Sequence, residues 1–216
     1  MNIQLQRQPT FNARNSTIRF ADDIVRKVNR EYPRISATKI ESFDSAKFFP
    51  YTMNNLWESI YDLRNKVIKD FFSASNFGKR ISGILAPIKK YKLGNCKESA
   101  QLSLIGAKVN GIKNCKICYL ESPSGYNYDH AVVLVKGKKP YIIDAWLGFA
   151  DYVPKAIERY QKEFRNCFDF KEAKTEKMLV REDVGIIQNF LNNKTSSLES
   201  REIIKKTFPE LILKKN

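Results

Sequence analysis

Three side chains in the middle of the chain have the types and the order of a cysteine-based catalytic triad: Cys96, His130 and Asp144. In such a triad the thiolate attacks an acyl carbon, and the imidazole carries a proton between the thiol and the leaving group. The carboxylate fixes the tautomer and the orientation of the imidazole. The sequence therefore predicts a cysteine nucleophile that acts on an amide or related acyl bond.

Cys96 stands at the start of a predicted helix over residues 96–110. Asn95 is a favourable N-cap, and Glu98 three positions later can complete a capping box. The unpaired N–H groups and the positive end of the helix dipole stabilise a thiolate in the first turn. This placement predicts that Cys96 is the nucleophile.

The oxyanion hole of such a site needs two donors. We expect the backbone N–H of Cys96 to be the first, since it lies at the helix tip where negative charge develops. The sequence does not identify the second, and the candidates are Asn95, Tyr91 and the pair Asn54 and Asn55.

His130 opens the most apolar run of the chain, and Asp144 closes a similar run. Because side chains alternate along a strand, neighbouring antiparallel strands can bring these two groups side by side. Asp129 should then point away from His130, and we interpret it as structural. Trp146 follows the acid, and with Asn95 it is a candidate residue of the substrate cleft.

The elements that must position these groups form an α+β pattern. Three β-rich runs at 116–121, 130–135 and 140–145, separated by turn residues such as those at 123–125, predict an antiparallel meander beside the helix 96–110. Helices are predicted on both flanks. We expect residues 1–16 to be a mobile N-terminal segment and residues 17–216 to be one catalytic domain. The core of this domain spans about 91–152, and its helical flanks span 17–90 and 153–216. The first flank is predicted to contain a helix at 53–72 and a short helix followed by a loop at 78–91. The second flank is predicted to contain helices at 153–164, 184–191 and 197–207.

A family resemblance comes from three segments: 94–100 (GNCKESA), 129–132 (DHAV) and 142–146 (IIDAW). Together they resemble the transglutaminase-like superfamily, whose core has a papain-like fold with a central helix packed on an antiparallel sheet. In that superfamily a Cys at a helix N-terminus is followed by a His on one strand and an Asp on the next. The resemblance covers about residues 91–152 and implies these roles for Cys96, His130 and Asp144.

Two related families fit less well. Papain-type proteases place their His much farther from the Cys and usually have Asn as the third residue. Arylamine acetyltransferases have a similar spacing, but an Arg-Gly-Gly run precedes their cysteine, where this chain has Leu93, Gly94 and Asn95.

A zinc site is the competing interpretation of the cysteines. Cys115 and Cys118, together with Cys96 and His130, are a ligand set that structural zinc accepts. However, a strand would place Cys115 and Cys118 on opposite faces, and the chain has no second Cys-x-x-Cys pair. A redox role is weaker still, because a reactive pair of this kind normally begins a helix. We therefore predict neither a metal nor a cofactor, and we expect reduced thiols, Cys167 included.

Charge and composition limit the partners. Lys and Arg number 38 against 23 Asp and Glu, for a net charge of +15. This excess attracts acidic proteins, nucleic acids or anionic membranes. The cations are scattered in pairs and match no nucleic-acid module, so we predict no dedicated nucleic-acid binding. No apolar run approaches the roughly 20 residues of a membrane span, and no signal-peptide core precedes residue 17. We expect a cytoplasmic protein, or one delivered to another cell by a route independent of general secretion.

These observations predict an acyl-transfer enzyme that acts on a protein substrate through a thioester, and the basic charge favours an acidic protein. Protease, glutamine deamidase and transglutaminase share the first half of that reaction and stay open, with hydrolysis as the first choice because water needs no second binding site. Bacterial effectors of the superfamily resemble this plan. The alternative is a non-catalytic basic module that binds nucleic acid or an anionic membrane.

Overall fold

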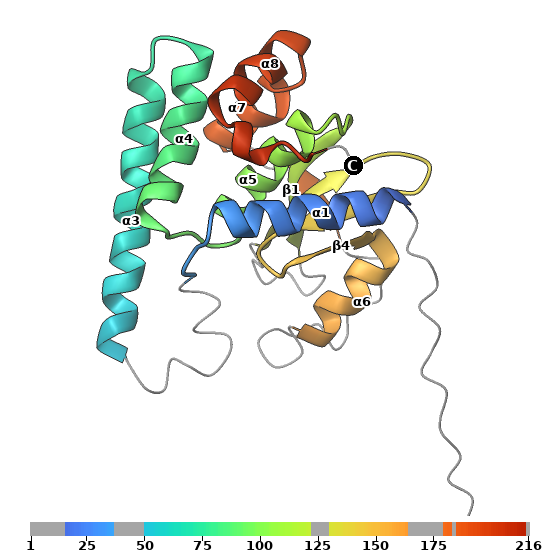
Figure 1. The fold of residues 1–216 in the computed structure, drawn as a ribbon. Helices are drawn as coiled ribbons and strands as arrows, with labels where there is room; N and C mark the ends of the chain where they lie inside the picture. Colours follow the sequence, from blue (N-terminus) through green and yellow to red (C-terminus); the bar gives the residue numbers. More distant parts are fainter. Residues whose placement is uncertain (1–15, 37–49, 122–129, 164–178, 183–184, 215–216) are drawn as a thin grey trace, which may run out of the picture.

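The computed structural model describes residues 16–36, 50–121, 130–163, 179–182 and 185–214 (Figure 1). The predicted mobile segment 1–16 lies outside these residues except for Ser16, which begins the first helix. The turn at 123–125, Asp129 and Cys167 also lie outside the described residues.

The chain has an α+β architecture, as the sequence predicts. Before the sheet come α1 (Ser16–Glu31), α3 (Pro50–Ser73), α4 (Phe77–Tyr91) and α5 (Cys96–Val109). The sheet strands are β1 (Cys115–Glu121), β2 (His130–Val135), β3 (Tyr141–Asp144), β4 (Phe149–Tyr152) and β5 (Leu179–Glu182). The remaining helices are α6 (Val153–Glu163), α7 (Ile186–Lys194), α8 (Leu198–Thr207) and a 3-10 turn at Pro209–Leu211. In the described part of the chain, no helix has the length and apolarity needed to span a membrane.

The sheet is antiparallel, with strand order β4-β3-β2-β1-β5. Strands β1, β2 and β3 are the predicted meander. The sequence did not predict β4, because its pattern assigns no element between Trp146 and the helix predicted at 153–164. Gly148 explains the difference: its φ of 84° is left-handed, and its N–H donates to the Asp144 carbonyl at 2.9 Å. This turn sends the chain back along β3, where Ile143 pairs with Ala150.

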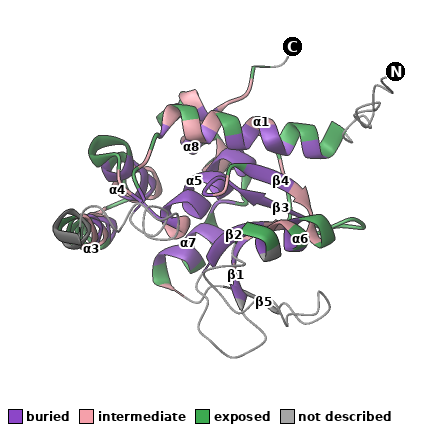
Figure 2. Ribbon diagram, turned by 90° about the horizontal axis from the view of Figure 1, so that it is seen from below, coloured by how far each residue is buried: buried purple, intermediate pink, exposed green. Residues whose placement is uncertain are grey.

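Helices cover both faces of the sheet. One face contributes Ile117, Val133 and Ile143 to the main core, which also contains the buried sides of α1 and α5. Every residue of α5 from Glu98 to Val109 is buried, and Figure 2 shows this helix enclosed within the molecule. The opposite face of the sheet packs against α6 in a second, smaller core. The first turn of α5, which contains Cys96, is thus held by packing on several sides.

Helix α4 is longer than the sequence predicts. The segment 78–91 was expected to be a short helix followed by a loop, because a proline inside a helix removes a hydrogen bond and clashes with the preceding turn. The helix instead continues through Pro87, which is buried with Ile84 and Ile88 in the contact with the rest of the core. Gly83, four residues earlier, lies close to the backbone of Asp70 in α3. Tertiary packing outweighs the local preference here.

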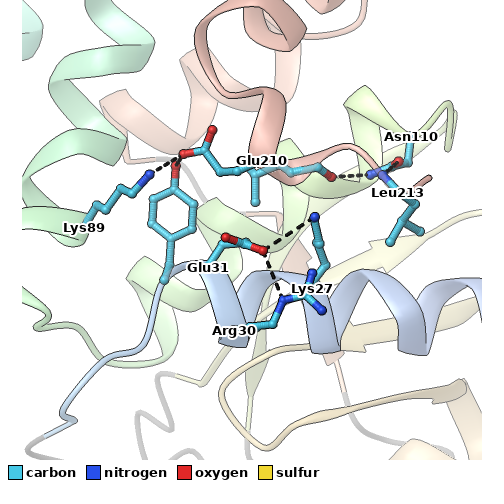
Figure 3. A network of polar contacts seen from close by, with 9 residues as sticks. Lys27, Arg30, Glu31, Lys89, Asn110, Glu210 and Leu213 are labelled. Carbon is cyan, nitrogen blue, oxygen red and sulfur yellow. Dashed lines mark hydrogen bonds and ion pairs between the residues drawn. The ribbon is translucent and has the colours of Figure 1, made fainter.

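The C-terminal segment ties α1, α4 and α5 together (Figure 3). Glu210 accepts hydrogen bonds from the Tyr32 hydroxyl at 3.0 Å and from Lys89 at 2.6 Å. The Asn110 side chain, just after α5, accepts from the Leu213 N–H at 2.8 Å. These bonds fix the far end of the helix whose first residue is Cys96.

Candidate active site

Cys96 is the first residue of α5, and the predicted capping box is present. The Glu98 carboxylate accepts the backbone N–H of Asn95 at 2.8 Å. Cys96 itself is partly buried and contacts both hydrophobic cores. Cys96 therefore lies where α5, the sheet and the helix on the opposite face of the sheet meet.

Gly94 lets the chain enter this helix. Its φ is +156°, and a Cβ built on it would lie 2.7 Å from the Cβ of Glu98. Both the backbone conformation and the space therefore favour glycine two residues before Cys96. The Ile35 carbonyl accepts the Gly94 N–H at 3.1 Å, which attaches this turn to the segment after α1.

An ion pair supports the helix start from α3. Arg64 donates from Nε to Oε1 of Glu98 at 2.8 Å and from Nη2 to Oε2 at 3.2 Å. Burial would raise the pKa of Glu98, but the hydrogen bonds and charge of Arg64 and the Asn95 N–H outweigh it and leave the pKa below its ordinary value. Glu98 is thus a buried but fully paired carboxylate. Arg64 was not identified from the sequence as the partner of the capping residue Glu98.

His130 and Asp144 form the predicted pair. Nε2 of His130 lies 2.7 Å from Oδ2 of Asp144, and both side chains are buried. The strand register pairs Leu134 with Ile142, so His130 and Asp144 are diagonal neighbours on one face of the sheet rather than directly opposite. Such diagonal neighbours are within reach of long side chains.

Three further groups donate to the Asp144 carboxylate. Its Oδ1 accepts the backbone N–H groups of Trp146 at 2.9 Å and Leu147 at 3.0 Å. Its Oδ2 accepts the Tyr160 hydroxyl at 2.9 Å in addition to His130. Hydrogen bonds to an ionised carboxylate favour the charged form. Groups from the turn between β3 and β4 and from α6 therefore hold the carboxylate in one orientation.

The protonation of this pair follows from its surroundings. Burial would lower the pKa of His130, but the charge and hydrogen bond of Asp144 and the contact with Cys96 outweigh it and raise the pKa to about 10. Burial would raise the pKa of Asp144, but the charge and hydrogen bond of His130, the Leu147 N–H and the Tyr160 hydroxyl leave it lowered. At neutral pH the pair is an imidazolium and a carboxylate.

His130 also contacts Cys96. Nε2 is engaged by Asp144, and a side-chain hydrogen bond with Cys96 is among the contacts that raise the pKa of His130. The structure thus brings the three predicted triad residues into one connected arrangement. A carboxylate, an imidazole and a thiol linked in this order are the groups that nucleophilic acyl transfer uses.

Aromatic rings hold the imidazole in place. The ring centroid of His130 lies 5.1 Å from that of Trp146 and 5.4 Å from that of Tyr160, the latter edge to face. The Trp146 indole donates to the Ser36 hydroxyl at 2.8 Å, and Ser36 donates to Oδ1 of Asn95 at 2.8 Å. The two residues named from the sequence as cleft candidates are therefore buried and joined through Ser36 behind the triad.

The second oxyanion donor stays a prediction. The Asn95 side chain is buried in the bond with Ser36. Tyr91 is 44% exposed at the last residue of α4, and Asn55 is exposed on α3. Asn54 lies outside the residues whose side chains are described.

Sequence reasoning missed Tyr160, Ser36 and Arg64. A signal existed for Tyr160, since it follows Ala156 and Ile157 on the apolar side of α6 and a buried tyrosine usually finds a hydrogen-bond partner. No local pattern connects Ser36 or Arg64 to the site, because each reaches it from a distant segment.

The structure describes two further cysteines. Cys115 and Cys118 are both buried in β1, and burial raises the pKa of Cys115 to about 11. Within the described residues, no group of three or more His, Cys, Asp or Glu side chains could hold a metal ion.

Comparisons with protein-family models, with curated proteins and with solved structures found no match to this chain.

Proposed function

We propose that this protein is a thiol acyl-transfer enzyme in which Cys96 is the nucleophile, His130 the proton carrier and Asp144 the group that orients and charges the imidazole. One observation supports it above all others. A single buried imidazole is hydrogen-bonded to a carboxylate on one side and contacts a cysteine at a helix N-terminus on the other. Each of the three groups has a setting suited to its role.

The proposed reaction begins with the Cys96 thiolate and the His130 imidazolium. The sulfur attacks the carbonyl carbon of an amide, and the oxyanion is stabilised by the Cys96 backbone N–H. The C–N bond then breaks, and His130 gives its proton to the leaving amine or ammonia. Water or an amine next attacks the thioester, His130 takes the proton of this acceptor, and the sulfur leaves as the thiolate. Asp144 stays ionised throughout.

The order of the triad and its elements supports a transglutaminase-like site as the finer assignment. The Cys begins a helix, the His opens one strand and the Asp closes the next strand of an antiparallel sheet. The acyl donor we propose is a carboxamide or peptide bond of a protein, and the net charge of +15 favours an acidic one. Hydrolysis, with water as the acceptor, is the leading reaction.

The test is a comparison of the wild type with Cys96→Ala on a mixture of acidic proteins, with intact masses as the readout. We expect products that depend on Cys96: cleavage fragments, a gain of about one mass unit for deamidation, or adducts of an added primary amine. Cys118→Ala, which removes a buried thiol from a neighbouring strand, is the control and should keep the products. If no product depends on Cys96 while Cys96 also alkylates no faster than Cys118, the proposal is wrong.

A further inference from the structure

A basic cavity lies at the opposite end of α5 from Cys96. It has a volume of about 410 Å³ and is formed by the last turn of α5, the loop into β1 and the turn between α7 and α8. Its described lining contains four cations and no carboxylate: Lys108, Lys113, Lys116 and Arg201, with Asn114, Asn192 and Ser196 as neutral polar groups. The volume falls in the range of small-molecule sites.

Lys108 is the unusual member of this cavity, because its side chain is buried and only 4% of the residue is exposed. Its ammonium donates to the Ser196 hydroxyl at 2.9 Å and to the Cys115 thiol. Burial raises the pKa of Cys115 to about 11, so this thiol carries no negative charge at neutral pH. Among the described residues, no carboxylate forms an ion pair with Lys108.

A buried ammonium without a counter-charge is costly. The last turn of α5 offsets part of this cost, since the carbonyl end of a helix carries about half a negative charge. Lys113 and Arg201 add further positive charge to the described lining. The cavity therefore has a strong positive potential that a small anion with several negative charges would neutralise.

The elements around the cavity are already cross-linked by hydrogen bonds. The Asn192 side chain of α7 accepts the Ile117 N–H at 2.8 Å and donates to the Ile117 carbonyl at 3.2 Å. Ser196, in the following turn, accepts from Lys108. An anion between Lys108 and Arg201 would add a charged link between α5 and α8. Binding should therefore stabilise the folded chain against unfolding.

We propose that this cavity binds a soluble small molecule that carries two or more phosphate groups. Phosphate oxygens accept several charge-assisted hydrogen bonds at once, which suits an ammonium and a guanidinium that face one cavity. A free phosphate compound fits better than a nucleic acid backbone, because the central cation is buried in a cavity rather than exposed on a surface. The site lies a full helix of 14 residues, roughly 20 Å, from Cys96, so it does not depend on the proposed catalysis.

The test uses thermal unfolding and titration calorimetry of the full chain with pyrophosphate, at constant ionic strength. We expect 1 mM pyrophosphate to raise the unfolding temperature by about 3 °C or more, and inorganic phosphate to raise it less. Lys108→Met should abolish the shift. Lys69→Met, which removes the same charge from an exposed position of α3, should leave it intact.

Other outcomes overturn the proposal. An equal shift in Lys108→Met and wild type would show that surface charge alone binds the anion. Binding of a short RNA or of anionic vesicles that needs Lys108, without any response to pyrophosphate, would assign the cavity to another class of ligand. If Lys108→Met fails to fold, Arg201→Gln takes its place, and an undiminished shift in that variant contradicts the proposal. Each result is independent of whether Cys96 is catalytic.

Discussion

The two ends of helix α5 differ in how their charges are balanced. At the Cys96 end, two buried carboxylates each have a cationic partner within the chain: Glu98 pairs with Arg64, and Asp144 pairs with His130. At the other end, Lys108 is buried against neutral groups and faces other cations. The helix therefore begins beside two ion pairs and ends beside a cavity whose described lining holds cations and no carboxylate.

This difference separates two kinds of function. A site whose charges are paired internally is pre-organised and can act on a substrate without further ligands. A site with unpaired buried charge gains stability when a counter-ion arrives. Breaking the pairs at the Cys96 end should therefore cost activity outright, whereas changes at the Lys108 end should matter only when an anion is present.

The largest loss is expected from Asp144→Asn. The amide cannot supply the charge that raises the pKa of His130, and it favours the wrong tautomer of the imidazole, so kcat/KM should fall about 10³-fold. The measurement is the rate of the Cys96-dependent product. Asp23→Asn on the exposed side of α1 is the control and should keep full activity. Retention of more than a tenth of the activity by Asp144→Asn would contradict the role of the carboxylate.

Gly94→Ala should damage the start of the helix. The new Cβ would clash with Glu98 in a backbone conformation that alanine rarely adopts, at a cost of about 1–3 kcal/mol in the free energy of unfolding. Because Glu98 caps the helix, the alkylation rate of Cys96 should fall as well. Gly137→Ala, where a Cβ meets no atom within 4 Å, should change neither quantity. Similar behaviour of the two variants would show that the cap does not position Cys96.

Tyr160→Phe tests how much the Tyr160 hydroxyl contributes to the orientation of the Asp144 carboxylate. It removes one donor to Oδ2 and keeps the ring against His130, so activity should fall about 10-fold while the fold is retained. Urea unfolding and the rate of product formation check the two halves of this prediction. Tyr61→Phe, at an exposed position of α3, serves as the matched control. An unchanged rate would mean that His130 and the Trp146 and Leu147 N–H groups orient the carboxylate without Tyr160.

The pH dependence of stability should report the His130–Asp144 pair. Since the pKa of His130 is raised from 6.5 to about 10, its contribution is fully present below pH 6.5 and is lost as the pH rises towards 10. Since the pKa of Asp144 is lowered, its contribution is present above about pH 4 and is lost on further acidification. The difference in unfolding free energy between wild type and His130→Gln should therefore be largest between about pH 4 and 6.5. A difference that stays constant from pH 5 to 10 would refute the pairing.

The smallest effect belongs to the other end of α5. Without added anion, Lys108→Met should change the catalytic rate less than about twofold, because the two sites are separated by the length of the helix. The rate assay of the previous variants measures it directly. A large loss of activity in a folded Lys108→Met protein would remove the contrast between the two ends.

Much of the local structure could be predicted from the sequence. The capping residues Asn95 and Glu98 indicated a helix start at Cys96, and the period-two runs around His130 and Asp144 indicated adjacent antiparallel strands. These features depend on residues close together in the chain, so local patterns carry them.

The rest depends on contacts between distant segments. Three residues reach the site from distant segments: Arg64 from α3, Ser36 from the segment that follows α1, and Tyr160 from α6. No local sequence pattern predicts contacts of this kind. The continuation of α4 through Pro87 and the pairing of β4 with β3 likewise follow from packing and from the turn at Gly148 rather than from local propensity. Tertiary contacts therefore determine the length of α4 and the pairing of β4, which local propensity does not predict.

The most direct test of the central claim is the rate at which iodoacetamide alkylates Cys96 at pH 6, in wild type and in His130→Ala, with peptide mass spectrometry as the readout. Activation by the imidazolium predicts labelling of Cys96 about tenfold faster in wild type than in His130→Ala, with Cys115 slow in both proteins. Equal rates for Cys96 in the two proteins would contradict the account, because His130 would then have no influence on the thiol it contacts.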